Sequence, residues 1–351
     1  MVIRNDLSSF MVTRVNQSTF AITEDDRFGE HPVLYAKLYP DRPVLVLSDT
    51  GLNAPHKRSR NAQYTEIRRF LEECPVPPND NQPLNPGGQK QYVIIISHCH
   101  YDHIYGLPAF YEQGHAIAPP IIVSSLTGKH FVSHDIYTHS LAKFRNLPRI
   151  EYKPTDFVAD DTDLVVKAGK LTSREFSTPD DIDTTNLGIT IFNTPGHVPD
   201  EIAWYDQAER HLYVGDSIYE TGDAHGIPGI YPGPIIFPKE GDWVTYVESM
   251  KHLLSFVQTT NLDGNTGENA RVMLGAAHNT ISVDAEEAIQ DVLDFLTRVG
   301  KGEVPITKRE TTRGEEYCRW DDGGRFGVGA PLRLCEEYRK HNSYTVSGWR
   351  N

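Results

Sequence analysis

A dense group of potential metal ligands lies near residue 100, in the stretch Ser97-His98-Cys99-His100-Tyr101-Asp102-His103. Three imidazoles and one carboxylate within six residues would repel one another, or lack partners in a folded core, without a cation. His98 and His100 share a face by the two-residue period of a strand, whereas Asp102 and His103 follow in a turn and a helix start. The stretch therefore predicts a metal centre with imidazole and carboxylate ligands.

The composition favours the same ligand chemistry. The 351 residues include 15 His but only 4 Cys, which disfavours thiolate sites such as zinc ribbons and iron–sulfur clusters.

The formal charge is −14, which is unfavourable for binding nucleic acid or anionic lipid. No apolar run is long enough for a signal peptide or a membrane span. We therefore expect a cytoplasmic protein with neither a nucleic-acid nor a membrane partner.

Regular elements that can position these ligands are visible in the pattern of apolar residues. Residues 92–97, directly before the ligands, form a short apolar run typical of a strand buried on both faces. Further strands are expected at residues 11–15, 19–23, 33–38, 43–48, 187–192, 201–205, 211–214 and 271–276. Helices are expected at about 62–73, at 243–257 after a cap at Asp242, and after a cap at Ser282.

The motif HxHxDH after an apolar strand resembles the metal site of the metallo-β-lactamase-fold hydrolases. This resemblance, over about residues 11–300, implies an α/β fold: an αββα sandwich of two mixed β-sheets flanked by helices. It also implies three more ligands at the ends of later strands. The sequence fills these positions in the expected order, with His197 in TPGH, Asp216 in GDS and His278 in GAAH.

The resemblance divides the ligands between two ions that share one carboxylate. The ligands of the first ion are His98, His100 and His197, those of the second are Asp102, His103 and His278, and Asp216 bridges the two. Imidazole and carboxylate ligands suit Zn²⁺, so two Zn²⁺ per chain are expected, with Fe or Mn left open. The implied reaction is hydrolysis by a metal-bound hydroxide, in which Asp102 can receive or pass a proton.

Single residues distinguish the branches of this family. Cys99 stands where flavodiiron relatives have Glu, and Asp216 stands where the clinical β-lactamases commonly have Cys, so neither oxygen chemistry nor penicillin hydrolysis is implied. Tyr219 follows the bridging Asp by three residues, as in acyl-homoserine lactonases, and is assigned to catalysis together with Asp102. Residues 218–241 are expected to form a lid with substrate contacts from Tyr219, His225, Tyr231 and Phe237.

The predicted organisation is a hydrolase domain at residues 1–300, with the lid as an insertion, and a C-terminal extension at 301–351 that packs on the core. We expect the enzyme to open a small cyclic amide or ester, that is, a lactam, lactone or cyclic carbamate. The size, the tail and the Pro-rich loop resemble fungal members of the family, some of which degrade plant-derived xenobiotics such as benzoxazolinones. The expected partner is a small apolar or aromatic acyl substrate, and a homodimer is left open.

Three alternatives remain at this point. One is hydrolysis of an acyl thioester, either of a polyketide or of glutathione. Another is a mononuclear iron oxygenase that acts on persulfides. The last is a metal-stabilised binding module without catalysis, which the complete ligand set disfavours because a structural zinc does not need an open two-metal site.

Overall fold

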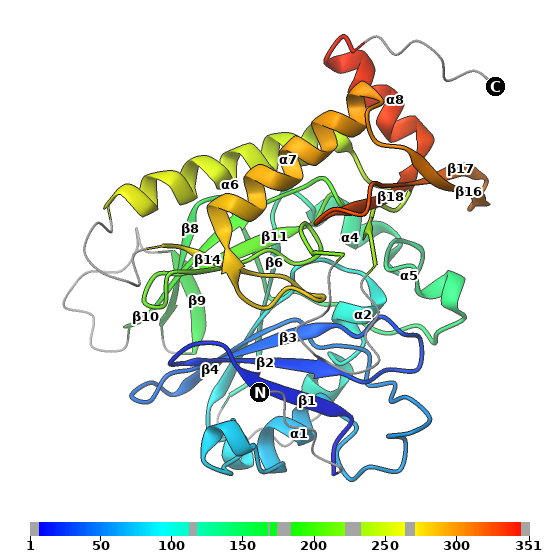
Figure 1. Ribbon diagram of the computed structural model, residues 1–351. Coiled ribbons are helices and arrows are strands. Elements are labelled where there is room, and N and C mark those ends of the chain that lie inside the picture. The colour runs from blue at the N-terminus through cyan, green and yellow to red at the C-terminus, as the bar shows by residue number, and fades with distance from the viewer. Residues whose placement is uncertain are drawn as a thin grey trace. The chain divides into compact units, whose positions relative to one another are not determined.

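The computed structural model describes residues 7–111, 118–167, 169–173, 184–221, 233–263 and 271–344 (Figure 1). The described residues form two compact units. The first unit contains the chain up to Asn193 together with Ile202–Glu209, and the second contains Thr194–Glu201 and the chain from Arg210 onward. The predicted domain boundary at residue 300 is not tested by this division and stays a prediction.

The first unit begins with a seven-stranded sheet whose strands follow one another in chain order. Neighbouring strands are antiparallel from β1 to β4 and parallel from β4 to β7, so the sheet is mixed. The strands are β1 (Phe10–Arg14), β2 (Thr19–Glu24), β3 (Val33–Leu38), β4 (Val44–Ser48), β5 (Gln91–Ile95), β6 (Ile121–Ser125) and β7 (Asp156–Val158). The strands expected in this part of the sequence are confirmed with small shifts at their ends.

Short helices cover one face of this sheet. The α-helices of the first unit are α1 (Ile67–Glu73), α2 (Tyr101–Ile104), α3 (Pro108–Tyr111), α4 (Lys129–His134) and α5 (Ile136–His139), and the 3-10 helices are η1 (Pro77–Asn79), η2 (Pro86–Gly88) and η3 (Ala142–Arg145). Side chains of α1, such as Phe70, join the apolar core formed with β1 to β5. Helix α1 begins later than predicted because the Glu66 side chain caps it, accepting the Arg69 N–H at 3.2 Å.

Four further strands of the first unit pack on the other face of the sheet. They are β8 (Thr162–Lys167), β9 (Lys170–Ser173), β10 (Thr184–Asn193) and β11 (Ile202–Asp206), which are antiparallel in the order β11-β10-β8-β9. The Trp204 indole N–H donates to Ser48 Oγ at 3.1 Å. Lys37 of β3 forms an ion pair of 2.5 Å with Asp206 of β11, and both side chains are buried. Two sheets thus face each other within this unit.

The second unit contains the remaining strands and the long helices. The strands are β12 (His211–Tyr213), β13 (Ile235–Ile236), β14 (Met273–Gly275), β15 (Val283–Asp284), β16 (Ile306–Thr312), β17 (Glu315–Asp321) and β18 (Gly327–Pro331), and the helices are α6 (Trp243–Asp263), α7 (Ala285–Lys301) and α8 (Leu332–His341). Helices α6 and α7 lie side by side (Figure 1). Mixed sheets with helices on their faces confirm the predicted fold class.

The two long helices test the capping predictions. Asp242 caps α6 as expected, because its Oδ1 accepts the Thr245 N–H at 3.0 Å, and the predicted apolar face is buried. The prediction that Ser282 caps the next helix is wrong. Residues 283–284 form β15 first, and Asp284 then caps α7 by accepting the Glu287 N–H at 3.0 Å.

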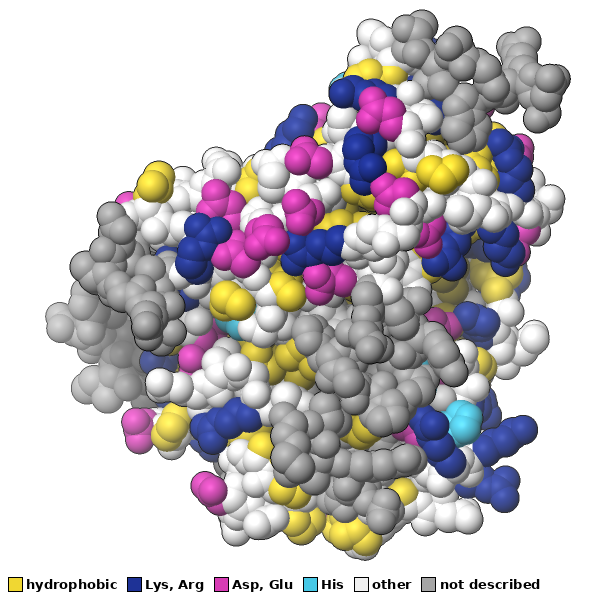
Figure 2. Space-filling view, viewed as in Figure 1, with side chains coloured by type: hydrophobic (Ala, Val, Ile, Leu, Met, Phe, Trp, Pro, Cys, Tyr) yellow, Lys and Arg dark blue, Asp and Glu magenta, His cyan; other side chains and the backbone are white. Residues whose placement is uncertain are grey.

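Acidic and basic side chains are interspersed on the surface around α7 (Figure 2). Arg325 pairs with Asp291 at 2.7 Å, and Arg298 pairs with Asp322 at 2.7 Å. Around α7, side chains of opposite charge therefore alternate on the surface (Figure 2). None of the helices in the described ranges combines the length and hydropathy needed to cross a membrane.

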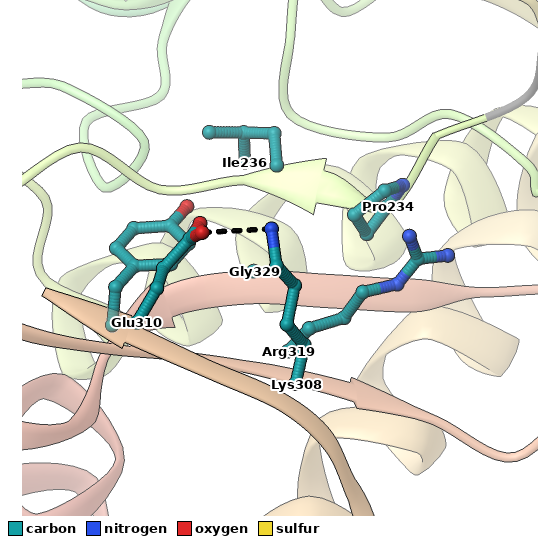
Figure 3. Close-up of a pocket in the computed structure, with 7 residues that line it drawn as sticks. Pro234, Ile236, Lys308, Glu310, Arg319 and Gly329 are labelled. Atoms are coloured by element: carbon teal, nitrogen blue, oxygen red, sulfur yellow. Dashed lines mark ion pairs between the residues drawn. The ribbon is translucent and has the colours of Figure 1, made fainter. Parts of the chain in front are cut away.

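The C-terminal strands form a four-stranded sheet in the order β13-β18-β17-β16. Strand β13 belongs to the predicted lid segment, and it pairs in parallel with β18. One face of the sheet packs on α8, and the other is hollowed by a shallow cavity of ≈ 170 Å³ (Figure 3). Pro234 and Ile236 lie on one side of this cavity, and the paired Lys308 and Glu310, 2.7 Å apart, lie on the other.

Candidate metal centre

The four predicted ligands of the first unit follow β5 directly, with His98 and His100 in the loop and Asp102 and His103 in the short helix α2. His98, His100, Asp102 and His103 are all buried. His98 Nε2 lies 2.8 Å from His100 Nδ1, and His103 Nε2 lies 3.6 Å from the Asp102 carboxylate. The chain turns sharply after β5, and α2 begins at Tyr101, so both pairs of side chains are presented from one continuous stretch.

The Asp49 carboxylate stabilises this segment through hydrogen bonds. It follows β4, and its carboxylate accepts the Ser97 N–H at 2.7 Å and the Ser97 hydroxyl at 2.8 Å. The same carboxylate lies 2.9 Å from His103 Nδ1. This contact fixes the ring so that Nδ1 faces Asp49 and Nε2 faces Asp102, which is the usual arrangement behind a metal-binding histidine. Thr50 also stabilises the ligand segment, because its hydroxyl donates a hydrogen bond to the His103 carbonyl at 2.8 Å.

The three predicted ligands of the second unit come from separate segments. Asp216 follows β12 and His278 follows β14, and these strands are parallel neighbours, so both residues emerge at the same end of the pair. The Asp216 carboxylate lies 3.3 Å from His278 Nε2 and 3.9 Å from His197 Nε2, through different oxygen atoms. A carboxylate between two imidazoles is the geometry that the prediction requires of a bridging ligand.

Two residues hold the segments of His197 and Asp216 together. The Asp216 N–H donates to the buried Glu201 carboxylate at 2.8 Å. The Tyr246 hydroxyl of α6 donates to the Ser217 carbonyl at 2.6 Å. Burial, and to a lesser degree the charge of Glu201, raises the pKa of Tyr246 well above its usual value. The Tyr246 hydroxyl therefore stays protonated and able to donate.

The residues predicted to contact substrate have different surroundings. The Tyr219 hydroxyl accepts the Ile236 N–H at 2.9 Å, and its ring lies edge-on to His278 at 5.3 Å. Phe237 is fully buried and packs on Trp243 of α6, with ring centroids 5.7 Å apart. His225 and Tyr231 lie outside the described residues. The substrate roles of all four, and the ligand roles above, stay predictions.

Four residues around the ligands were missed by sequence reasoning: Asp49, Glu201, Tyr246 and Ser249. None has a spacing that indicates a metal ligand. The sequence gives one weak indication of a special role for Asp49, because it follows a buried strand in Ser-Asp-Thr-Gly. In the structure it adopts a left-handed conformation with φ of 62°. Tyr246 was predicted only as part of an apolar helix face.

The donor set fits a borderline divalent cation. Buried imidazole and carboxylate groups of both units can hold metal ions. His98 Nε2 and His100 Nδ1 are 2.8 Å apart, so either one ring donates a proton to the other or both lone pairs turn toward one cation. No thiolate is needed, and all four Cys are buried and form no disulfide. Such nitrogen and oxygen donors suit Zn²⁺, with Fe or Mn as alternatives.

Comparisons with known proteins identify the family. The family model of the Metallo-beta-lactamase superfamily matches residues 45–260, more than half of the chain. The chain belongs to the metallo-beta-lactamase superfamily, which confirms the resemblance inferred from HxHxDH. Members of this superfamily are generally metal-dependent hydrolases, and the buried His and Asp groups of this chain support the same class.

A sequence relative and two solved structures were also found. The "Putative transcription factor avaE" of Aspergillus versicolor is 30% identical over 323 residues, covering 91% of this chain and 83% of that protein. A metallo-beta-lactamase from Erythrobacter litoralis, with beta mercaptoethanol in its active site, is 12% identical with a TM-score of 0.49 and covers 84% of this chain and 100% of its own. A metallo-beta-lactamase from Pontibacter korlensis is 13% identical with a TM-score of 0.49, and the match covers 82% of this chain and 99% of that protein.

Proposed function

We propose that the protein is a dinuclear zinc hydrolase that opens a small cyclic amide or ester. The observation that carries the proposal is the Asp216 carboxylate, which lies between His278 and His197 at 3.3 and 3.9 Å as a bridging ligand should. In this proposal the two ligand groups act together. His98, His100 and His197 hold one ion, Asp102, His103 and His278 hold the other, and Asp216 is shared.

The chemistry divides between the cofactor and the chain. Zinc, when bound, supplies acidification of a water molecule and Lewis acidity toward a carbonyl. In this proposal Asp102, whose Oδ2 lies 3.6 Å from His103 Nε2, takes up the proton that hydrolysis releases and returns it to the leaving group. The Tyr219 hydroxyl accepts the Ile236 N–H at 2.9 Å, and in this proposal it donates a hydrogen bond to the substrate carbonyl or leaving group.

The substrate is proposed to be a lactam, lactone or cyclic carbamate with a small apolar or aromatic body, such as a plant-derived benzoxazolinone. The net charge of −14 and the interspersed charges around α7 favour an uncharged compound over a polyanion (Figure 2). We further propose a cytoplasmic, xenobiotic-degrading role in a fungus, and the Aspergillus versicolor source of the sequence relative supports the fungal part of this proposal.

The experiment that tests this function combines metal content with turnover. We expect about two zinc ions per purified chain, loss of both by chelation, and turnover of lactams or lactones that zinc restores. Asp216→Ala should lose one or both ions and reduce turnover at least about 100-fold, because the shared carboxylate is removed. Asp322→Ala, which removes a surface carboxylate paired with Arg298, is the matched control and should leave both unchanged. A metal-free protein with full activity would contradict the proposal.

A substrate panel separates the rival enzymes. Faster turnover of polyketide or glutathione thioesters than of lactams and lactones would favour the thioester hydrolase. Oxygen uptake with glutathione persulfide would favour the iron oxygenase. Metal binding with no turnover of any of these compounds would favour a binding module.

The Aspergillus relative provides one observation in favour of a second function, a role in transcription. That role would require recognition of DNA or of a DNA-bound protein. Because the acidic balance of the chain disfavours phosphate contacts, we place it second. A fluorescence titration with random duplex DNA at low salt tests it directly, and saturable binding below about 1 µM would favour it.

A further inference from the structure

Helix α6 makes direct contact with the segment that carries His197. Gly196 has a φ of 149°, and a Cβ at this position would lie 2.3 Å from Tyr246 Cα and 2.7 Å from Tyr246 N. The backbone of the helix therefore touches the backbone of the loop, which only glycine permits. The Asp242 N–H also donates to the Gly196 carbonyl at 2.8 Å, so the start of α6 is bonded to this loop.

Side chains of the same helix reach two ligand segments. The Ser249 hydroxyl donates to the Pro195 carbonyl at 2.7 Å, two residues before His197. The Tyr246 hydroxyl donates to the Ser217 carbonyl at 2.6 Å, one residue after Asp216. Tyr246 is thus the residue that touches both segments, one through its backbone and the other through its hydroxyl.

The contacts are rigid for physical reasons. Tyr246 is fully buried, and its ring packs against Phe237 with centroids 5.0 Å apart at an angle of 84°. A buried tyrosine has only two side-chain torsions, and the packed ring fixes both, so the hydroxyl holds the Ser217 carbonyl at a set position. Glu201 provides a parallel link, because it accepts the Asp216 N–H and its backbone carbonyl accepts the Thr194 N–H at 2.8 Å.

We propose that Tyr246 is a positioning residue that sets the spacing between His197 and Asp216, and with it the affinity and geometry of the metal centre. The inference rests on the proposed function only in requiring that these two residues bind metal. It concerns residues of the second unit alone, and it assigns to α6 a role beyond covering the core.

The test measures metal binding, so that it does not depend on a substrate. The protein is freed of metal by chelation and titrated with Co²⁺, whose visible absorption bands report the geometry of its ligands. Tyr246→Phe keeps the ring but removes the hydroxyl. We expect at least one Co²⁺ dissociation constant to rise about tenfold, together with a shift of the bands, because partners behind metal ligands typically contribute 10- to 100-fold in affinity.

Tyr338→Phe is the matched control, because Tyr338 is also a buried tyrosine of the second unit but lies on α8. It should lower the melting temperature to a similar extent while leaving the Co²⁺ bands and affinities unchanged. A Tyr246→Phe protein with wild-type bands and affinities would overturn the inference. If that variant does not fold, Ser249→Ala takes its place, and the same reading applies with a smaller expected shift. A wild-type protein that binds no Co²⁺ would overturn the proposed function itself.

Discussion

The two units hold their candidate ligands in different ways. In the first unit four ligands come from six consecutive residues, and the neighbouring carboxylate of Asp49 fixes that stretch through Ser97 and His103. In the second unit the three ligands are separated by up to 81 residues of sequence, and glutamate, tyrosine and serine side chains tie their segments together. One group is local and is held mainly by one buried carboxylate, whereas the other is non-local and is held by Glu201 and by side chains of α6. We therefore expect one substitution to disrupt the first group of ligands. In the second group, each substitution of a supporting residue should lower metal affinity only in part.

The largest effect is expected from Asp49→Ala in the first unit. The change removes three contacts from a buried carboxylate, and it leaves the Ser97 N–H and hydroxyl and the His103 ring without that acceptor. We expect a loss of about 4 kcal/mol in the free energy of unfolding and at least a tenfold loss in zinc affinity. Urea unfolding and competitive zinc titration measure the two effects.

Glu73→Ala is the control for this prediction. Glu73 pairs with Arg69 on α1 of the same unit, and both side chains are about half exposed, so its removal should cost about 1 kcal/mol or less and should not alter zinc affinity. Equal effects of the two variants would show that the first unit has no single supporting position.

The next effect is expected from Gly196→Ala in the second unit. The added methyl group would collide with the Tyr246 backbone, and the φ of 149° is unfavourable for alanine. We expect a loss of about 3 kcal/mol from overpacking and backbone strain. Gly188→Ala provides the comparison, because Gly188 also has a positive φ of 64° but a Cβ there meets nothing within 4 Å. It should cost about 1 kcal/mol, and a similar loss in both variants would mean that contact with α6 contributes little.

A smaller effect is expected from pH on the free energy of unfolding. The direction of this change with pH should differ between the two units. Burial raises the pKa of Glu24 in the first unit to about 7, although the Leu52 and Ala54 N–H groups partly offset the rise. Between about pH 5 and 6.5 the unfolded chain has lost this proton while the folded chain keeps it, so stability falls as pH rises, by about 2 kcal/mol. Glu24→Gln should remove this fall, as seen in the difference between wild-type and variant unfolding curves.

The second unit contains a group with the opposite sign. The bond with Arg271 lowers the pKa of Asp284, so the stabilisation from this carboxylate is present above its unfolded pKa and is lost as pH falls through the folded value. Asp284→Asn should therefore lower the free energy of unfolding less in acid than at neutral pH. A Glu24→Gln protein with an unchanged pH profile would remove the contrast between the units.

The sequence could predict the local group of ligands more directly than the distant one. His98, His100, Asp102 and His103 lie so close together in the sequence that their spacing alone indicates a metal centre. His197, Asp216 and His278 each stand alone, and only the order of strand ends in a known family brought them into the prediction.

The supporting residues could not be predicted because their role depends on tertiary contacts. Tyr246 and Ser249 fit the pattern of an ordinary helix face, and nothing local shows that a loop carbonyl lies opposite them. The cap at Ser282 failed for a related reason, because pairing of β15 with β14 extends the strand to Asp284 and moves the helix start. The strands were predictable because burial on both faces leaves a continuous apolar run that local sequence displays.

The buried pair of Lys37 and Asp206 has a consequence for how the chain acquires its structure during synthesis. Lys37 is made early, but its partner is 169 residues further along. Until residues 202–209 have left the ribosome, the first unit lacks its last strand, and the Lys37 ammonium group, which is buried in the complete unit, must remain hydrated. Its two sheets can therefore close against each other only after the segment with His197 has been synthesised. By then one ligand of the second unit has emerged, before the first unit is complete.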